Sequence, residues 1–359
     1  MTTNNKTRVI SLPSLFRRMI QRPVLAIDFG TANTRIYNSF DGKTIERPSS
    51  IGLSLGKSGN ITNEDFQYIN NKISTKPLRS GVIVDLKNAT LLVKPFIKKT
   101  GIFLLAPITL TCAPTGTTEK ERDSLRHALM NAGASQVPII PEVWAAASGA
   151  GIDVTLPKAQ CVVDIGAGVT DLAVFRDGRI MYCSSIRLAC NDLQRAVRSA
   201  VVSKYRIQAF DIYNEKLIHV ISSLPLSLQS EQEKKCATFD FSGIDIVKRK
   251  EVHRCVKKTD ISQSIEPVLE KIMAMIELSL KRLPEKLYCE LLESEIILTG
   301  GGACIEGMDR LIAYRTNMQV SVSSDPLHSV INGAIQTLNF WNGKKSWWKN
   351  MAWPKLACL

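Results

Sequence analysis

The residues best suited to chemistry in this chain are aspartates that each precede a glycine turn. Residues 161–175, CVVDIGAGVTDLAVF, place Asp164 after an apolar run and before Gly166, Gly168 and a second apolar run. Two strands around a glycine turn predict a β-hairpin. Glycine lets the backbone approach a ligand and turn its N–H groups outward, which suits a phosphate. An aspartate at a strand end can hold Mg²⁺ through water, because this ion keeps most of its hydration shell.

A single hairpin of this kind is more often structural than functional, but the pattern occurs twice. Residues 24–37, VLAIDFGTANTRIY, repeat the apolar run, the aspartate, the glycine and the threonine at the same spacing, beginning with Asp28 and Gly30. Such a repeat predicts two like domains that each offer one loop to the same phosphate chain. A third glycine cluster, residues 300–302, lies between a predicted strand at 295–298 and a predicted helix, which is a common place for a nucleotide.

The remaining segments must hold these loops in place, and their alternation of strands and helices predicts an α/β protein. Thr118 is a plausible N-cap with Glu121 as its capping-box partner, and Glu142 opens a helix after a strand at 137–140. Polar stretches at 56–80 and 225–260 predict insertions, the second of them a small β structure. Further helices are predicted at 191–205, 214–221, 264–282 and 325–338.

Composition excludes some classes of protein. The chain has 359 residues and is 45% hydrophobic, enough for two domains with full cores. The nine cysteines include no CxxC pair, and the four histidines show no metal spacing, which argues against a zinc site. This cysteine usage favours reduced thiols in a cytoplasmic protein.

The net charge of +13 is concentrated at the two ends of the chain, so the high pI does not require a nucleic-acid groove. Residues 12–22 predict a short amphipathic helix with a basic face, and the tail 340–359 interleaves four tryptophans with four lysines. Both patterns are typical of segments that bind an anionic membrane surface. The alternatives are docking on the body of the protein, a protein partner or, for the first segment, a disordered tail. No stretch resembles a signal peptide or reaches transmembrane length.

With these residues in view, the chain resembles the bacterial actin MreB family, within the superfamily of actins, sugar kinases and heat-shock-chaperone ATPases. The segments that carry the resemblance are IDFGTANTRIY, VVDIGAGVTDLAVF and ILTGGGACIEGMDRL. Connecting segments such as PLRSGVIVD, EVWAAASGAG and SDPLHSVINGA follow in the family's order and favour this family over a kinase or a chaperone.

The resemblance implies an actin-like two-domain fold of duplicated RNase H-like domains, with two smaller insertion subdomains and a nucleotide cleft. It implies ATP and Mg²⁺ as cofactors, and filaments on the inner face of the cytoplasmic membrane that guide cell-wall synthesis and cell shape. Cell-wall synthesis or shape proteins would be partners, and nucleic acid would not. The expected first domain comprises 24–163 and 325–339 with an insertion near 56–84, and the second comprises 164–324 with an insertion near 206–262.

Site residues also follow from the resemblance. Asp28 and Asp164 would position Mg²⁺ and its water shell, and Glu142 would orient or deprotonate the attacking water. The alternative for Glu142 is a helix N-terminal acid favoured by the helix dipole. Phosphate and nucleoside contacts would come from Gly30, Thr31, Ala32, Asn33, Gly166, Ala167, Gly168, Glu215, Lys216, Gly300, Gly301 and Gly302.

The chain also departs from the family at several of these places. Ala189, Cys190 and Asn191 stand where the family has a glycine pair and an aspartate, Val169 stands where close relatives have threonine, and Ile218 stands where a lysine is common. We therefore expect nucleotide binding, with hydrolysis slower than in the family. A non-hydrolysing scaffold or segregation filament is the main alternative. A small-molecule kinase is a weaker one, because no candidate for a catalytic aspartate in a sugar pocket is found.

Overall fold

The structure is a computed structural model that describes residues 22–52, 74–99, 105–210 and 238–341. The predicted amphipathic segment up to residue 21 and the tail from residue 342 lie outside the described residues. The same holds for the predicted helix 214–221, with Glu215, Lys216 and Ile218.

Two five-stranded sheets with the same topology form the framework, which bears out the repeat predicted from the sequence. In each sheet three antiparallel strands follow one another, and two further strands then run parallel to the first. The first sheet has the order β3-β2-β1-β8-β9, with β1 (Val24–Phe29), β2 (Asn33–Asn38), β3 (Lys43–Pro48), β8 (Ile108–Ala113) and β9 (Ile139–Pro141). The second has the order β12-β11-β10-β16-β17, with β10 (Gln160–Ile165), β11 (Thr170–Arg176), β12 (Arg179–Ile186), β16 (Glu295–Thr299) and β17 (Gln319–Val322).

The central strands are buried on both faces, which explains their near-continuous apolar sequences. Every residue of β10 after Gln160 is buried, and so is every residue of β11 before Arg176. The edge strand β3 is instead exposed along its length and carries Lys43, Glu46 and Arg47. Charges on an edge strand disfavour pairing with a strand of another chain.

Helices cover both faces of the first sheet. One face packs on α2 (Leu86–Lys99) and α3 (Glu119–Asn131), whose buried residues share a core with Leu25 and Ile27 of β1. Thr118 caps α3 through the predicted capping box with Glu121, so that prediction is confirmed. The other face, which carries Ala26 of β1, packs on α4 (Glu142–Gly149) and α11 (Ser329–Trp341).

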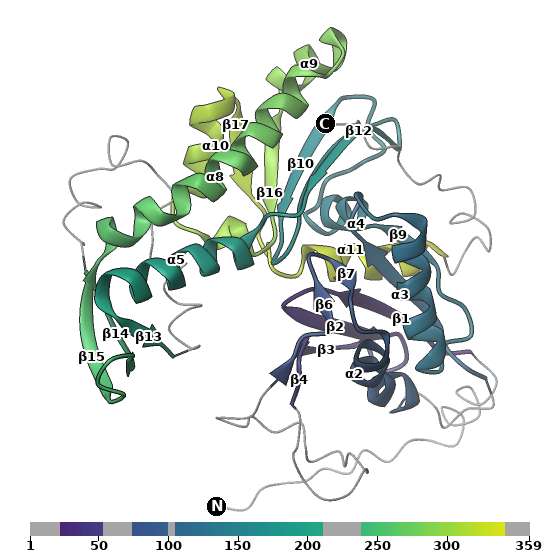
Figure 1. Ribbon diagram of the computed structural model, residues 1–359. Coiled ribbons are helices and arrows are strands. Elements are labelled where there is room, and N and C mark those ends of the chain that lie inside the picture. Colours follow the sequence, from purple (N-terminus) through teal and green to yellow (C-terminus); the bar gives the residue numbers. More distant parts are fainter. Residues whose placement is uncertain (1–21, 53–73, 100–104, 211–237, 342–359) are drawn as a thin grey trace, which may run out of the picture.

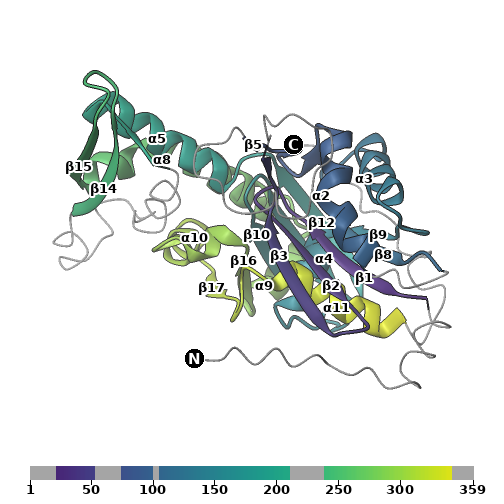
Figure 2. The ribbon, with the colours of Figure 1, turned by 90° about the horizontal axis from the view of Figure 1, so that it is seen from below.

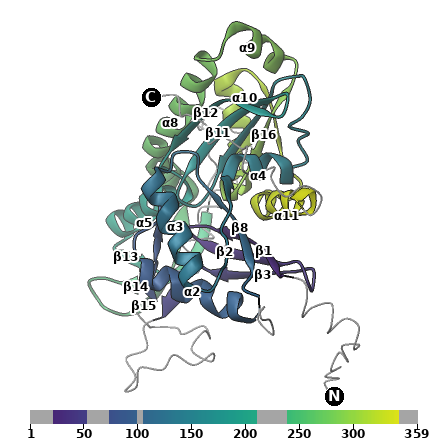
Figure 3. The ribbon, with the colours of Figure 1, turned by 90° about the vertical axis from the view of Figure 1, so that its right-hand side faces the viewer.

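Helix α4 packs against both sheets. Its residues Ala145 and Ala146 share a core with the first sheet, whereas Val143, Trp144 and Ala147 pack on Phe175 and other residues of the second. The rings of Trp144 and Phe175 meet edge to face, 5.6 Å apart between centroids. Figure 3 shows α4 and α11 together between the two sheets. Glu142 at the start of α4 therefore lies where the two halves of the protein join.

The opposite face of the second sheet packs on α5 (Cys190–Tyr205) and α8 (Lys258–Lys281) in the largest apolar core. Helix α8 begins six residues before its predicted start, because Ile261 is buried in that core and continues the apolar stripe of the helix. Helix α11 instead begins four residues after its predicted start, at Ser329. Strand β10 begins at Gln160 and lies entirely in the second sheet, so the second half starts before the expected boundary at residue 164.

The smaller elements lie at the periphery. The predicted small β insertion forms the sheet β13-β14-β15, which projects away from both large sheets (Figures 1 and 2). The expected irregular insertion ends in short strands, since residues 74–75 pair with 51–52 and residues 78–79 pair with 82–83. No helix in the described part of the chain is long and apolar enough to cross a membrane. The remaining bounds are β4 (Ile51–Gly52), β5 (Ser74–Thr75), β6 (Leu78–Arg79), β7 (Val82–Ile83), β13 (Ile207–Ala209), β14 (Thr238–Asp245), β15 (Glu251–Lys257), α9 (Glu285–Leu292), η2 (Gly301–Cys304) and α10 (Met308–Thr316).

Candidate functional site

The structure brings the glycine loops of the two hairpins together. A Cβ atom added to Gly168 would lie 2.9 Å from Oγ1 of Thr31 in the other loop and 2.8 Å from Cα of Ser80. The turn between β6 and β7 joins them further, since the Gly81 N–H donates to Oγ1 of Thr31 at 2.9 Å. Only a glycine at position 168 permits this approach. Thr31 and Gly168 are 137 residues apart in the sequence, and their contact makes the two loops face one site.

The third glycine cluster packs on the second hairpin. Gly300 has a φ of +80°, and a Cβ added there would lie 2.7 Å from Oδ1 of Asp164. Thr299, the last residue of β16, donates a hydrogen bond of 2.7 Å to the same oxygen. A Cβ added to Gly302 would lie 2.3 Å from Cγ2 of Ile165. Residues 300–302 are thus held against Asp164 by contacts that a side chain would prevent.

Four carboxylic acids from distant parts of the chain act on one another at this place, and we call them the carboxylate cluster. They are Asp28 on β1, Glu142 at the start of α4, Asp164 on β10 and Asp171 on β11. The three aspartates are buried. Asp171 links the two halves, because its Oδ1 accepts a hydrogen bond of 2.7 Å from the Thr115 hydroxyl, which follows β8 of the first sheet.

The cluster holds its acids away from their usual titration range. Burial raises the pKa of Asp164 to about 7, and the charges of Asp171 and Asp28 add to the effect, while the hydrogen bond from Thr299 and the charge of Arg35 oppose it. Burial also raises the pKa of Asp28 and of Asp171. The pKa of Glu142 lies well above its usual range, because burial and the charges of all three aspartates disfavour its ionised form.

One guanidinium group offsets part of this negative charge. Arg35 on β2 stands opposite Asp28 in the strand pairing, and its Nη1 lies 3.2 Å from Oδ2 of Asp28. Its Nη2 lies 2.9 Å from Oε1 of Glu46 on β3. His328, just before α11, approaches the other oxygen of Glu46 at 3.3 Å and also contacts Asp325 at 2.8 Å. This network leads from the carboxylate cluster to the segment that carries Pro326, whose carbonyl accepts from the Gly300 N–H.

The cluster suits a hydrated cation better than a directly bound one. Within the part of the chain that the structure describes, no three histidine, cysteine or acidic side chains are placed to chelate one metal ion. Burial raises the pKa values of all four acids, so a positive charge beside them would favour their ionised forms. Mg²⁺ with its water shell meets both conditions, because it reaches carboxylates through water and brings two positive charges. Asp28 and Asp164 would hold those waters.

The residues that depart from the family pattern lie beside the second glycine loop and hold it through their backbone. The Cys190 N–H donates to the carbonyl of Gly166 at 3.2 Å, and the Asn191 N–H donates to that of Ala167 at 2.8 Å. The Sγ atom of Cys190 lies 3.8 Å from a Cβ added to Gly301, so the thiol occupies space beside the expected nucleoside loop. Burial raises the pKa of this thiol to about 12, which keeps it neutral. Val169 is buried, and Cγ2 of its side chain packs beside Gly81.

The other predicted residues fall into three groups. Gly30 and Asn33 pack together, since a Cβ added to Gly30 would lie 2.7 Å from the Asn33 carbonyl oxygen. Ala32 is exposed in the same loop, available to a ligand. Glu215 and Lys216 lie outside the described residues, so their placement stays a prediction.

Sequence reasoning missed Arg35, Asp171, Thr299 and Ser80. Arg35 and Asp171 each follow a hairpin aspartate by seven residues, and each is a charged residue in the second strand of its hairpin. The equal spacing of seven residues in the two hairpins could have identified both residues from the sequence. Nothing in the sequence pointed to Thr299 or Ser80, whose roles depend on chain segments packed against them.

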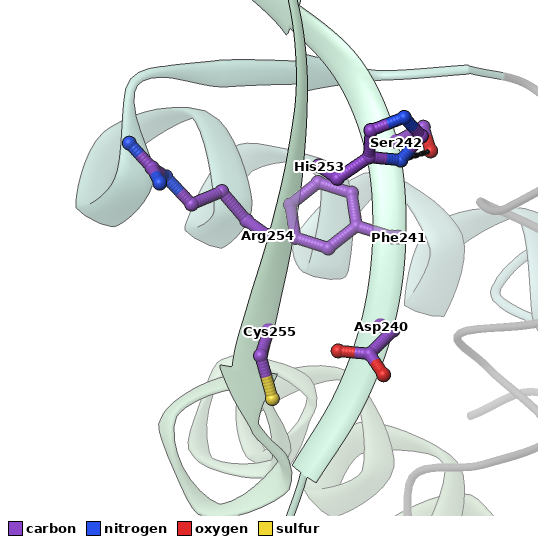
Figure 4. A pocket seen from close by; sticks show the side chains of 6 residues that line it. All are labelled: Asp240, Phe241, Ser242, His253, Arg254 and Cys255. Carbon is purple, nitrogen blue, oxygen red and sulfur yellow. Dashed lines mark hydrogen bonds between the residues drawn. The ribbon is translucent and has the colours of Figure 1, made fainter.

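A second hollow lies on the projecting sheet, far from the glycine loops. It is lined by Asp240, Phe241, Ser242, His253, Arg254 and Cys255. Figure 4 shows Asp240 beside Cys255, and Ser242 bonded to Nδ1 of His253. These are cross-strand neighbours of β14 and β15. The hollow brings together no glycine loop or carboxylate cluster, so we place the candidate site at the hairpin loops.

Known proteins resemble this chain over most of its length. The family described as MreB/Mbl protein matches residues 22–345. The cell shape-determining protein MreB of Escherichia coli strain K12 is 28% identical over 336 residues, which are 90% of this chain and 95% of that protein. The crystal structure of MreB5 of Spiroplasma citri bound to ADP has a TM-score of 0.77 at 27% identity, covering 92% of this chain and 99% of the other. The same protein bound to AMPPNP has a TM-score of 0.76 at 27% identity, with 90% and 99% covered.

Proposed function

This chain belongs to the MreB/Mbl protein family, and we propose that it is a nucleotide-dependent cytoskeletal protein that assembles into filaments and helps to determine cell shape. The names of its relatives support the role in cell shape. The observation that carries the proposal is the approach of Gly168 to Thr31, which makes two duplicated loops face one site.

We assign ATP to that site. The first loop, from Gly30 to Asn33, and the second, from Gly166 to Gly168, would give backbone N–H groups to the phosphates. Gly301 and Gly302 would flank the nucleoside, with Glu215 and Lys216 as further contacts. The adenine-nucleotide complexes of the Spiroplasma citri relative support this assignment.

Glu142 is the residue that we assign to hydrolysis. It lies at the start of α4, among Asp28, Asp164 and Asp171, and would be the acid that meets the water attacking a terminal phosphate. In the protein alone its raised pKa favours the protonated form, which cannot accept a proton. Mg²⁺ would supply positive charge that favours ionisation of the neighbouring acids. Asp28 and Asp164 would orient the waters of that ion.

A nucleotide-binding scaffold that does not hydrolyse is the second candidate, and one observation favours it. Cys190 and Asn191 use their N–H groups on the Gly166 and Ala167 carbonyls, which ties the second loop to α5. Asn191 stands where the resemblance to the family implies an aspartate, so this chain lacks one carboxylate that could help to position Mg²⁺ or the ribose.

The proposed location is the cytoplasm, at the inner face of the cytoplasmic membrane. The basic segment 12–22 and the tail 340–359 would bind anionic lipid, and shape or cell-wall synthesis proteins would be partners. The sequence pattern of these segments supports this part of the proposal. Deletion of residues 1–22 and 340–359 should abolish flotation with anionic liposomes, and undiminished flotation would contradict the membrane role.

The first experiment on function compares the full chain with Glu142→Gln. Phosphate release and sedimentation are followed together, with Mg-ATP and with Mg-AMPPNP. We expect both proteins to sediment with nucleotide and only the wild type to release phosphate. Sedimentation without release by the wild type would select the scaffold. Failure to bind or assemble with either nucleotide would refute the proposed function.

A further inference from the structure

We propose that Arg35 is a built-in counter-cation of the nucleotide site, a positioning residue that competes with the metal ion for Asp28 and lowers the affinity of the site for Mg²⁺. The inference rests on the proposed nucleotide site but concerns a residue that none of the roles above requires. It begins with a contact, because Nη1 of Arg35 lies 3.2 Å from Oδ2 of the aspartate assigned to the metal's water shell.

The strand register makes this contact a fixed feature of the fold. Asp28, Arg35 and Glu46 are direct neighbours across β1, β2 and β3, so their side chains share one face of the sheet. Only 11% of the Arg35 side chain and 8% of the Asp28 side chain are exposed to solvent. Water therefore screens this ion pair weakly, and the pair must rearrange or share its charge when a cation approaches Asp28.

The charge of Arg35 also reaches beyond its direct partner. It lowers the pKa of Asp28 and that of Asp164 on the other sheet, which means that it stabilises both negative charges. A cation bound near these aspartates through water would act in the same direction. Arg35 and Mg²⁺ thus offset the same buried charge, and the presence of one reduces the free energy gained from the other.

Arg35 itself is incompletely satisfied. Its Nε atom is buried and makes no hydrogen bond within the described residues. A guanidinium group has five N–H donors, and buried donors are normally paired. The Nε atom thus offers a donor that the oxygen of a bound phosphate or of a metal-bound water could occupy.

Glu46 sets how much of the Arg35 charge acts on the cluster. It holds Nη2 of Arg35 at 2.9 Å, and its own charge raises the pKa of Asp28. Removing the charge of Glu46 should therefore weaken metal binding, whereas removing that of Arg35 should strengthen it. The opposite signs of these two effects distinguish the proposal from a general loss of structure.

The test measures Mn²⁺ binding to the full, nucleotide-free chain by the electron paramagnetic resonance signal of free Mn²⁺, at constant ionic strength. We expect Arg35→Met to lower the dissociation constant about tenfold and Glu46→Gln to raise it about twofold, in line with a charge change a few ångströms from the site. Arg35→Lys keeps the charge and should stay within about twofold of the wild type.

Arg47→Met is the matched control. Arg47 follows Glu46 on the exposed strand β3, so its side chain points to the other face of the sheet. The inference would be overturned if Arg47→Met also bound Mn²⁺ about tenfold more tightly than the wild type. It would also be overturned if wild type and Arg35→Met bound Mn²⁺ with equal affinity, or if neither bound it. If Arg35→Met does not fold, an unchanged or tighter dissociation constant in Glu46→Gln would overturn it.

The same proteins separate this inference from the proposed function. Binding of a fluorescent ATP analogue is measured on each variant. If the wild type binds no nucleotide but the variants keep the predicted order of Mn²⁺ affinities, the proposed function fails and the role of Arg35 stands. If nucleotide binds and the Mn²⁺ affinities are equal, the reverse holds.

Discussion

Arg35 and Asp171 occupy equivalent positions in the two duplicated hairpins and carry opposite charges. Arg35 pairs with Asp28 across β1 and β2, and Asp171 pairs with Asp164 across β10 and β11, each seven residues after the aspartate. Duplication of one hairpin has therefore produced an ion pair on one side and a pair of acids on the other. The site is electrostatically asymmetric although its framework is symmetric.

The pair of acids predicts a pH-dependent stability. The pKa of Asp164 is about 7 in the folded protein and about 3.9 in an unfolded chain. An acid whose pKa is raised by folding stabilises the folded state least when it is ionised. The contribution of Asp164 to the free energy of unfolding is therefore complete below about pH 4 and is lost as the pH rises to about 7.

We expect Asp164→Asn to raise the melting temperature of the nucleotide-free protein at pH 8 and to change it little at pH 4. The difference should correspond to a few kcal/mol, since each unit of pKa shift is worth about 1.4 kcal/mol. Thermal melts of both proteins between pH 4 and pH 8 measure it. Asp41→Asn, in an exposed turn, is the control, and a difference that shrinks with rising pH would contradict the prediction.

The approach of the two loops predicts the effect of a single methyl group. Gly168→Ala would place Cβ 2.8 Å from Ser80 Cα and 2.9 Å from Thr31 Oγ1, so the two loops must separate. We expect ATP-analogue affinity to fall at least tenfold, because the N–H groups no longer converge on one phosphate chain. Fluorescence titration measures the affinity, with a melting curve as the control for folding. Wild-type affinity in a folded variant would show that the loops do not share a ligand.

The crossing of α4 and α11 predicts a larger loss of stability. A Cβ on Gly333 would lie 1.9 Å from the Ala145 carbonyl oxygen, and one on Gly149 would lie 1.8 Å from that of Ser329. Gly333→Ala should therefore cost about 2–4 kcal/mol, although alanine has the higher helix propensity. Urea denaturation measures this cost. Gly52→Ala, whose Cβ would meet nothing within 4 Å among the described residues, should be nearly neutral, and equal effects of the two changes would refute the close crossing.

The capping box of α3 predicts a modest effect. Thr118→Ala removes the side chain that accepts from the Glu121 N–H, and loss of such a cap costs about 1 kcal/mol. Ser124→Ala is the control, because its hydroxyl bonds the Lys120 carbonyl within the same helix without capping it. Urea denaturation of both variants should show a loss only for Thr118→Ala. A similar change for both would mean that the cap contributes nothing.

Local features were accessible from the sequence. The spacing of Asp28 and Gly30, repeated at Asp164 and Gly166, predicted both hairpins, and Thr118 with Glu121 predicted the start of α3. Turns and caps depend on residues a few positions apart, so the amino-acid types alone specify them. The repeat likewise predicted two sheets of one topology.

Only the tertiary structure decided how charge is distributed at the site. Asp171 meets Thr115 across 56 residues, Glu46 meets His328 across 282, and Gly168 meets Ser80 through backbone contact. Such contacts depend on which segments pack together, and a pKa depends on burial and on every neighbouring charge. The sequence thus determined which residues could bind a phosphate and a cation, whereas packing determined that four acids share one site and that the guanidinium of Arg35 lies beside Asp28.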